Sequence, residues 1–236
     1  MHNIINKIKK VFPILLCISV LTGCHTKTVN MKTHDIVYDK DYISVNAKIP
    51  VFSGLDKAFA EFLNDNTMKK YEKYISDFDA DALSVHDGGN GPKFELNIEP
   101  VLTCNKKFLS YIMVTDSFSG GTHKLTAKAA TTVDLSSNSP IFISDMFTDG
   151  TDYASILTEY MQNLAETDFK TYNDLWEAPS FTAQQNEDFY IQDDKIIIFY
   201  PPYDLAPYSA GFIEFPIPLS DINEYLKPEY QSLTSK

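Results

Sequence analysis

The sequence predicts an α+β fold in which antiparallel sheets pack with two main helices. Neighbouring segments of alternating apolar and polar residues are separated by single segments of helical periodicity, an order typical of this class. The chain is also rich in large apolar side chains, with 16 Phe and 14 Tyr among 236 residues. This composition provides a sizeable core without a framework of disulfide bonds.

The first half of the fold is expected to hold one helix and four strands. The loosely alternating, β-branched segment Tyr42–Pro50 predicts a strand. Apolar residues at three- and four-residue steps predict a helix over Leu55–Ile75, with a break expected at Asn64–Asn66. A glycine-rich loop is expected at 86–92. Three more strands are predicted, at 93–103, 108–118 and 125–135.

The second half shows the clearest helical period in the chain. From Tyr153 to Leu164, apolar residues recur at three- and four-residue steps along one face. Residues 189–191 and 196–200 flank a polar turn, which predicts a hairpin. A last strand is expected at 211–219, and Ser220-Asp221 is expected to cap a short helix ending at Leu226.

The first residues are typical of an export signal rather than of the folded domain. Three lysines precede Val11–Val20, a run of ten residues that is too short for a bilayer span of ~20 apolar residues. Leu21-Thr22-Gly23-Cys24 then resembles the bacterial lipobox. We therefore predict a signal peptide over residues 1–23 and lipidation of Cys24. The polar residues 24–40, without a clear period, are predicted to form the lipidated tether.

Charge excludes one class of partner and favours another. The net charge is −12, and it becomes −15 once the three lysines of the signal are removed. All 20 basic residues are Lys, so the bidentate phosphate contacts that Arg provides are missing, and a nucleic-acid partner is excluded. An acidic surface favours encounter with a cationic partner.

No pattern predicts a metal or cofactor site. Asp77, Asp79 and Asp81 alternate like the first ligands of a calcium loop, but Ala82 and Gly88 occupy the positions that require Gly and Glu. These acids are therefore expected to be solvated. The spacing of the histidines at positions 25, 34, 86 and 123 matches no zinc motif.

Catalysis is not expected either. The chain has no Gly-x-Ser-x-Gly elbow, and Cys104 within a strand is expected to be a structural thiol. A catalytic set can be drawn from Asp116, Ser117 or Ser119, and His123, but closeness in sequence says nothing about geometry. We therefore expect no enzyme, with a cell-wall hydrolase or esterase kept as an alternative.

Two segments have a composition that favours a binding surface. Ser119–His123 contains paired glycines after a strand, and Tyr200–Gly211 combines three prolines with three tyrosines. Rigid loops that present aromatic rings bind at little entropic cost. The alternative is that these rings fill the edge of the core. The predicted binding residues are Gly120, Gly121, His123, Tyr200, Pro202, Tyr203, Pro207, Tyr208 and Gly211.

The same segments resemble the extracytoplasmic domains of unknown function shared by the anti-sigma factor RsiV and the deacetylase PdaC. The resemblance rests on Gly120-Gly121-Thr122-His123, on Ile143-Ser144-Asp145-Met146-Phe147, and most specifically on Tyr200–Gly211. It covers about Tyr42 to Leu226. It implies an RsiV-like α+β domain with an N-terminal PdaC- and RsiV-like region at 41–139 and a C-terminal RsiV-like region at 140–228.

The resemblance also implies a function. In RsiV the domain binds lysozyme, and in PdaC it accompanies a separate deacetylase domain, which this sequence lacks. Only ten residues precede the apolar run, so no cytoplasmic sigma-binding domain is expected. We therefore expect an extracytoplasmic, membrane-anchored lipoprotein that binds a cationic protein such as lysozyme, or peptidoglycan. A purely structural envelope lipoprotein remains an alternative.

Overall fold

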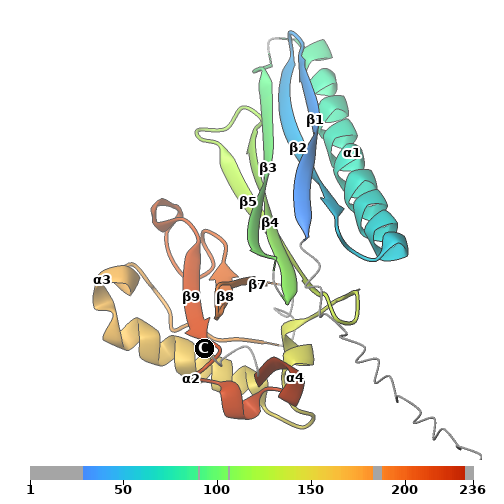
Figure 1. The fold of residues 1–236 in the computed structure, drawn as a ribbon. Helices are drawn as coiled ribbons and strands as arrows, with labels where there is room; N and C mark the ends of the chain where they lie inside the picture. The colour runs from blue at the N-terminus through green and yellow to red at the C-terminus, as the bar shows by residue number, and fades with distance from the viewer. Residues whose placement is uncertain (1–28, 90, 106, 183–187, 232–236) are drawn as a thin grey trace, which may run out of the picture.

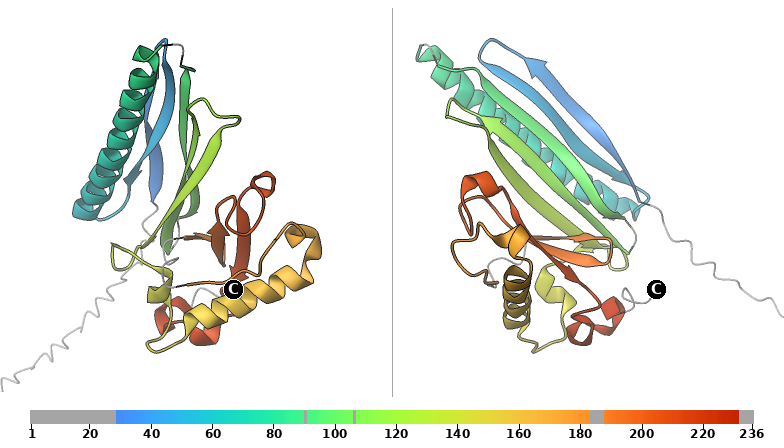
Figure 2. Two further views of the ribbon diagram at one scale, coloured as in Figure 1. Left: turned by 180° about the vertical axis from the view of Figure 1, so that it is seen from behind. Right: turned by 90° about the vertical axis from the view of Figure 1, so that its left-hand side faces the viewer.

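Two sheets of unequal size organise the chain, as the computed structural model shows for residues 29–89, 91–105, 107–182 and 188–231 (Figure 1). The larger sheet has six strands in sequence order, and a long helix covers one of its faces (Figure 2). Its strands are β1 (Asn30–Asp39), β2 (Ile43–Ser53), β3 (Phe94–Asn105), β4 (Phe108–Phe118), β5 (Leu125–Asp134) and β6 (Ser139–Pro140). The predicted α+β class is confirmed.

One pair of strands departs from the antiparallel arrangement that the sequence predicted. β2 and β3 are parallel, with Ile43 opposite Phe94, whereas the other neighbours in this sheet are antiparallel. A helix runs back along the sheet between them, and this crossover brings the chain to the same end before the next strand begins. The pairing direction is thus a consequence of the helix, not of the strand sequences.

The long helix α1 (Lys57–Asp87) is continuous, so the predicted break at Asn64–Asn66 is wrong. Asn64 faces β2, where its amide nitrogen donates to the carbonyl oxygen of Phe52 (3.0 Å) and its amide oxygen accepts from the Phe52 N–H (2.8 Å). An asparagine that pairs with a neighbouring strand does not compete with its own helix. The helix also extends into the predicted 86–92 loop.

β1 corrects the expected tether. Residues 30–39 were expected to be unstructured, but they pair with β2 from Asn30 opposite Ser53 to Asp39 opposite Ser44. β1 is an edge strand with mostly exposed side chains, so its polar sequence resembles that of a linker. The expected signal peptide, Cys24 and the first part of the tether lie outside the described residues.

The C-terminal part packs a helix on a small sheet. The sheet consists of β7 (Phe189–Gln192), β8 (Lys195–Tyr200) and β9 (Ile213–Pro218), all antiparallel. The helix α2 (Tyr153–Thr167) buries Leu157 and Met161 in the same core as Ile198 and Phe215. The predicted helix and hairpin are both present. The short helices α3 (Phe169–Tyr172) and α4 (Pro228–Gln231) complete this part.

The expected helix after β9 is a single 3-10 turn at Asn223–Tyr225, without a side-chain cap. Ser220 and Asp221 do not cap it, because Asp221 accepts hydrogen bonds from Ser220 (2.9 Å) and Tyr160 (2.7 Å) instead. Among the described residues, no helix combines the length and the apolar character required to cross a bilayer.

The second face of the small sheet packs on the large sheet. Ile112 of β4 lies in one buried cluster with Tyr190, Ile197 and Phe199 of β7 and β8. An ion pair between Lys128 of β5 and Glu214 of β9 (2.6 Å) borders this contact. The two sheets are therefore held in a fixed relation.

A buried carboxylate ties the end of the chain to the large sheet. Asp134 is 4% exposed and accepts hydrogen bonds from the Tyr230 hydroxyl (3.0 Å) and from the Ser136 N–H (2.7 Å) and hydroxyl (2.6 Å). Burial alone would raise the pKa of Asp134, but these hydrogen bonds outweigh burial and lower it. Asp134 therefore contributes to the free energy of unfolding at pH values above its unfolded-state pKa. This contribution is lost as the pH falls through the lowered folded-state pKa.

We expect Tyr230→Phe to lower the free energy of unfolding by about 1–2 kcal/mol at pH 7, because the ionised carboxylate loses a buried donor. The loss should shrink as the pH falls through the lowered pKa of Asp134, where the carboxylate takes up a proton. Urea denaturation over a pH series measures both effects. Tyr203→Phe, which alters an exposed ring, serves as the control with no change expected. A loss that is equal at all pH values would contradict this account.

Candidate functional site

The structure brings the two predicted binding segments together at one surface. The tip of the β4–β5 hairpin carries His123, and the segment between β8 and β9 carries Tyr203 and Tyr208. The His123 ring stacks on Tyr208 with 4.1 Å between ring centroids and 25° between planes, and Tyr203 lies 5.6 Å beyond Tyr208. Three rings from two distant segments thus form one continuous row.

A shared backbone carbonyl holds this row in place. The Tyr208 hydroxyl donates to the carbonyl oxygen of Lys124, and Nδ1 of His123 lies 3.0 Å from the same oxygen. The contact joins the hairpin tip to the proline-rich segment 84 residues later. The rings are therefore arranged before any ligand arrives.

The backbone on both sides requires unusual conformations. Gly120 has φ +97° and Gly211 has φ +71°, in the region that favours glycine. A Cβ on Gly120 would meet Cγ of Pro92 at 2.4 Å. Tyr203 itself has φ +77°, which is strained for a bulky residue. Its N–H donates to the Ala206 carbonyl (3.0 Å), which closes the turn that holds the ring outward.

Tyr200, which was predicted for the binding surface, is buried in the structure. Tyr200 is 3% exposed, and its hydroxyl donates to the carbonyl oxygen of Ser180 while its ring meets Phe215 edge-on. Its prediction as part of the surface is wrong, because it belongs to the core beneath α2. Leu205 and Ala206 are also buried and fasten the segment from below. Tyr203, in contrast, is 60% exposed.

The remaining predicted residues have mixed positions. Tyr208 and Pro202 are half-buried at the base of the surface, and the residues that reach solvent are Gly120, Gly121, His123 and Pro207. Gly211 is half-buried and ends the 3-10 turn at Tyr208–Ala210.

Trp176 borders the same surface, although it was not among the binding residues predicted from the sequence. It is 55% exposed, its N–H donates to the Leu205 carbonyl (3.0 Å), and its indole Nε1 donates to the Asp204 carbonyl (3.3 Å). Its uniqueness was the only sequence signal, since it is the one Trp of the chain. We call His123, Trp176, Tyr203 and Tyr208 the aromatic surface.

The catalytic set that was kept as an alternative shows no hydrogen bond between Asp116 and His123, both of which the structure describes. Asp116 accepts a hydrogen bond from the Thr126 hydroxyl (2.6 Å), and the ring of His123 is engaged by Tyr208 and by the carbonyl of Lys124. Across the described part of the chain, no three His, Cys, Asp or Glu side chains converge in a manner suited to a metal ion.

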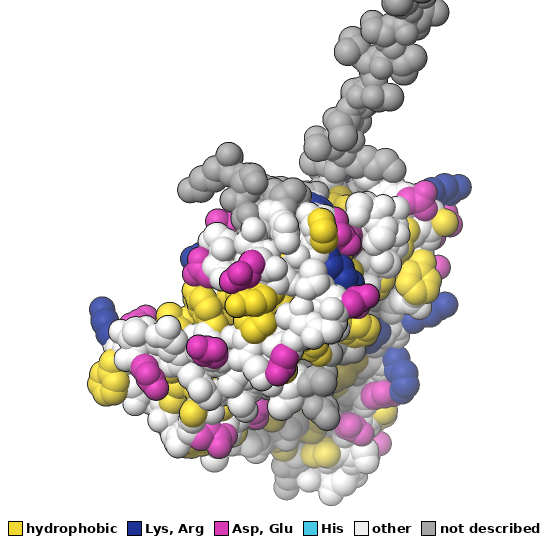
Figure 3. All heavy atoms as spheres, turned by 90° about the horizontal axis from the view of Figure 1, so that it is seen from below, with side chains coloured by type: hydrophobic (Ala, Val, Ile, Leu, Met, Phe, Trp, Pro, Cys, Tyr) yellow, Lys and Arg dark blue, Asp and Glu magenta, His cyan; other side chains and the backbone are white. Residues whose placement is uncertain are grey.

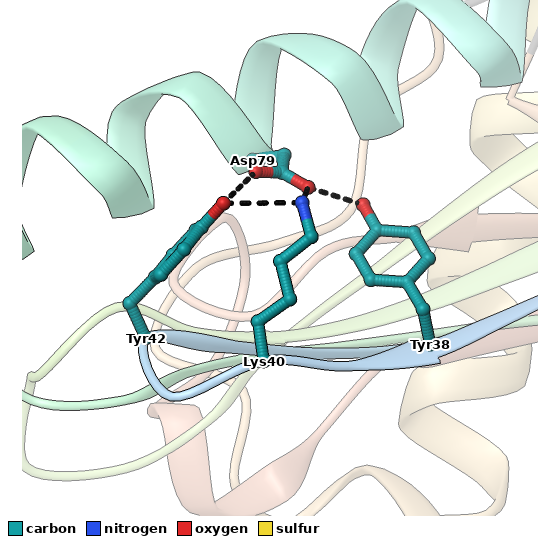
Figure 4. Close-up of polar contacts among 4 residues, drawn as sticks. All are labelled: Tyr38, Lys40, Tyr42 and Asp79. Carbon is teal, nitrogen blue, oxygen red and sulfur yellow. Dashed lines mark hydrogen bonds and ion pairs between the residues drawn. The ribbon is translucent and has the colours of Figure 1, made fainter.

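A polar cluster joins Asp79 of α1 to residues of β1 and of the turn that follows it (Figure 4). Asp79 accepts hydrogen bonds from Tyr38 (2.7 Å) and Tyr42 (3.0 Å) and forms an ion pair with Lys40 (2.7 Å). The expectation that Asp79 is simply solvated is therefore wrong, whereas Asp77 is exposed and pairs with Lys73. We call Tyr38, Lys40, Tyr42 and Asp79 the β1 clasp, because it fastens β1 and the following turn to α1.

The electrostatics of the β1 clasp support this role. Burial acts to raise the pKa of Asp79, but hydrogen bonds from Lys40 and the two tyrosines outweigh burial and lower it. Burial, followed by the hydrogen bond to Asp79, raises the pKa of Tyr38 to about 12. Asp79 is thus kept ionised and Tyr38 protonated, which is the state in which their hydrogen bond persists.

Comparison with known proteins identifies both halves of the fold. Residues 36–126, from β1 into β5, match a family model described as Deacetylase PdaC. Residues 144–220 match one described as Protein of unknown function (DUF3298). The predicted family resemblance is confirmed. No curated protein matches the chain.

Solved structures of DUF3298 family proteins share the fold. A member from Bacteroides fragilis NCTC 9343 is 19% identical, with a TM-score of 0.65 over 89% of this chain and 99% of that one. A DUF3298 family protein from Pseudomonas aeruginosa PAO1 is 13% identical, with a TM-score of 0.59 over 86% and 95% of the two chains. At these identities the likeness establishes the fold alone.

The two neighbouring glycines provide a matched test of the hairpin tip. We expect Gly120→Ala to lower the free energy of unfolding by about 1–3 kcal/mol, because a non-glycine residue at positive φ is strained and also meets Pro92. Gly121→Ala should be nearly neutral, since its Cβ has no neighbour closer than 3.8 Å. Chemical denaturation of both variants measures the difference. Equal losses would show that the conformation of Gly120 does not constrain the tip.

Proposed function

We propose that this chain is a membrane-anchored envelope lipoprotein that captures a cationic protein of the lysozyme type through its aromatic surface. The observation that carries the proposal is the row of rings in which the half-buried Tyr208 lies between the exposed His123 and Tyr203, with hydrogen bonds from Tyr208 and from the Tyr203 backbone holding it. Aromatic rings that are already ordered contribute large contact area while little side-chain entropy is lost on binding.

Charge supports a cationic partner. The chain has a net charge of −12, and acidic side chains are scattered among exposed hydrophobic ones on the face in Figure 3. Beside the rings, Asp174, Glu177 and Asp204 are exposed. Lys124, the cation nearest in sequence to His123, is engaged by Glu95 (2.6 Å). Such a rim steers a positively charged protein toward the rings and holds it there.

The family resemblance supports the choice of partner, because the related domain of RsiV binds lysozyme. A lipid on Cys24 would hold the captured protein at the membrane surface. The anchor would not pass through the membrane, so the proposed outcome is capture or inhibition of the partner rather than a signal to the cell interior.

Cell-wall glycan is the second candidate, and Trp176 is the observation that favours it. The Trp176 indole is held by one hydrogen bond of its own and by one from the backbone of the same residue. Left more than half exposed, it presents a flat face, which suits the apolar faces of sugar rings. Binding to an uncharged glycan would depend little on salt, whereas binding to a cationic protein weakens as salt screens the charges.

We expect immobilised protein to retain lysozyme, with lower affinity at moderate than at low salt. Tyr203→Ala should weaken binding at least about tenfold, the loss typical of an anchor residue. Tyr74→Ala, which removes an exposed ring from α1, is the matched control and should leave the affinity unchanged. Retention is measured by pull-down and affinity by titration calorimetry.

Absence of lysozyme binding at both salt concentrations would overturn the lysozyme proposal. Salt-insensitive retention on purified peptidoglycan, lost in Trp176→Ala, would instead establish the glycan candidate.

The anchor has a separate test. Metabolic labelling with a palmitate analogue should label the native chain, and Cys24→Ala should abolish the label and release the protein from the membrane fraction. Cys104→Ala is the matched control, because it removes the only cysteine of the described residues and should leave labelling intact. A labelled Cys24→Ala variant would refute anchoring at Cys24.

A further inference from the structure

The first half of α1 carries an exposed stripe that neither family match explains. Its members recur at three- and four-residue steps, so they share one side of the helix, and no acid is among them. We call this set the α1 stripe: Phe59, Phe62, Asn66, Lys69, Lys70 and Lys73. Phe62 is 58% exposed and stacks, with 6.4 Å between ring centroids, on Phe59, which is half-buried and packs against the core. Exposed aromatic rings interspersed with lysines are typical of helices that lie on membranes.

Opposite charges are separated on this half of the helix. Glu61, Asp65 and Glu72 recur along a different flank, so an anionic surface would attract one side of α1 and repel another. Lys73 forms an ion pair with Asp77 (2.7 Å), while Lys69 and Lys70 have no ion-pair partner among the described residues. Lys70 also lies over the Tyr71 ring, 5.7 Å from its centroid, and neither ammonium is engaged by a carboxylate of the described residues.

The large sheet leaves the stripe open. Beside Phe62 and Lys70 lies a groove of about 240 Å³, whose opposite wall includes Met113, Ala129 and Pro140 of the sheet. The side chains of the stripe therefore border a shallow, partly apolar recess rather than a packed interface.

The stripe also lies near the point where the chain enters the fold. β1 begins at Asn30, which pairs with Ser53, and α1 begins at Lys57 four residues later. Asn30 lies six positions after Cys24, and six residues span at most roughly 20 Å. A lipid on Cys24 would hold Asn30 within that distance of the membrane, and Ser53 beside Asn30 leads into α1.

The β1 clasp couples the position of β1, and so of the proposed lipid anchor before it, to the orientation of α1. Because Asp79 binds Tyr38, Lys40 and Tyr42, β1 does not swing independently of α1. A pull on the tether is thus transmitted to the helix, and the helix keeps its orientation relative to the point of attachment.

From these observations we infer that the α1 stripe docks on anionic phospholipid headgroups of the membrane in which the chain is anchored. The inference rests on the proposed lipid anchor at Cys24. The anchor holds the stripe at the surface, so contacts that are individually weak suffice. α3, which Trp176 follows in sequence, lies across the molecule from α1 (Figures 1 and 2). Docking therefore turns the aromatic surface away from the membrane and toward its ligand.

Tryptophan fluorescence tests the contact in the full-length lipidated chain. Phe62→Trp in a Trp176→Phe background places one reporter in the stripe, and the native chain carries its reporter at Trp176. Both are reconstituted in phosphatidylcholine vesicles with or without phosphatidylglycerol, using brominated lipids as quenchers. We expect at least about twofold quenching of the stripe reporter in the anionic vesicles, and none of Trp176. Asn66→Trp, which keeps both lysines, is a second reporter should Phe62→Trp fold poorly.

Charge reversal supplies the matched pair. Lys69→Glu should abolish the quenching, whereas Lys170→Glu, the same change on exposed α3, should leave it intact. If the chain floats with the vesicles but the stripe reporter is not quenched, the anchor is supported and the docking is overturned. Equal quenching in vesicles of neutral lipid overturns the role of anionic headgroups. A native chain that does not float refutes the anchor, and the docking falls with it.

Discussion

The packing of the small sheet on the β4–β5 face of the large sheet determines the geometry of the whole molecule. Ile112 meets Ile197 and Phe199 in this contact. The aromatic surface depends on it, because His123 belongs to one sheet and Tyr208 to a segment that leaves the other. Neither segment could order the pair alone, since the stacking of two rings adds only about 0.5–1.5 kcal/mol beyond their burial. The site is therefore a product of tertiary structure.

Sequence patterns predicted the elements that bury apolar side chains in the core. α2 was identified because its apolar residues recur with the helical period, and β4 occupies the predicted residues 108–118. β1 was mistaken for a tether because an edge strand needs few buried side chains. The break expected in α1 depended on Asn64, whose partners on β2 lie 12 residues away in the sequence. The parallel pairing of β2 and β3 follows from the path of a helix, which strand sequences do not encode.

The same limit applies to the candidate site. Glycines, prolines and tyrosines indicated the two segments correctly, because each of these residue types restricts or presents the chain locally. Whether a given tyrosine faces solvent depends on what packs against it. Tyr200 is covered by α2, while Tyr203, three residues later, is turned outward by the backbone. Trp176 joins the site through carbonyls 28 and 29 residues further along the chain, a distance at which local patterns carry no information.

The left-handed backbone at Tyr203 has a consequence for how this surface can change. Glycine or asparagine would relax the strain there, so selection for folding stability alone favours losing the ring. Selection for ligand contact favours keeping it. Stability and ligand contact therefore favour different residues at position 203. A variant of this domain selected for thermal stability alone would fold well but lose the exposed ring.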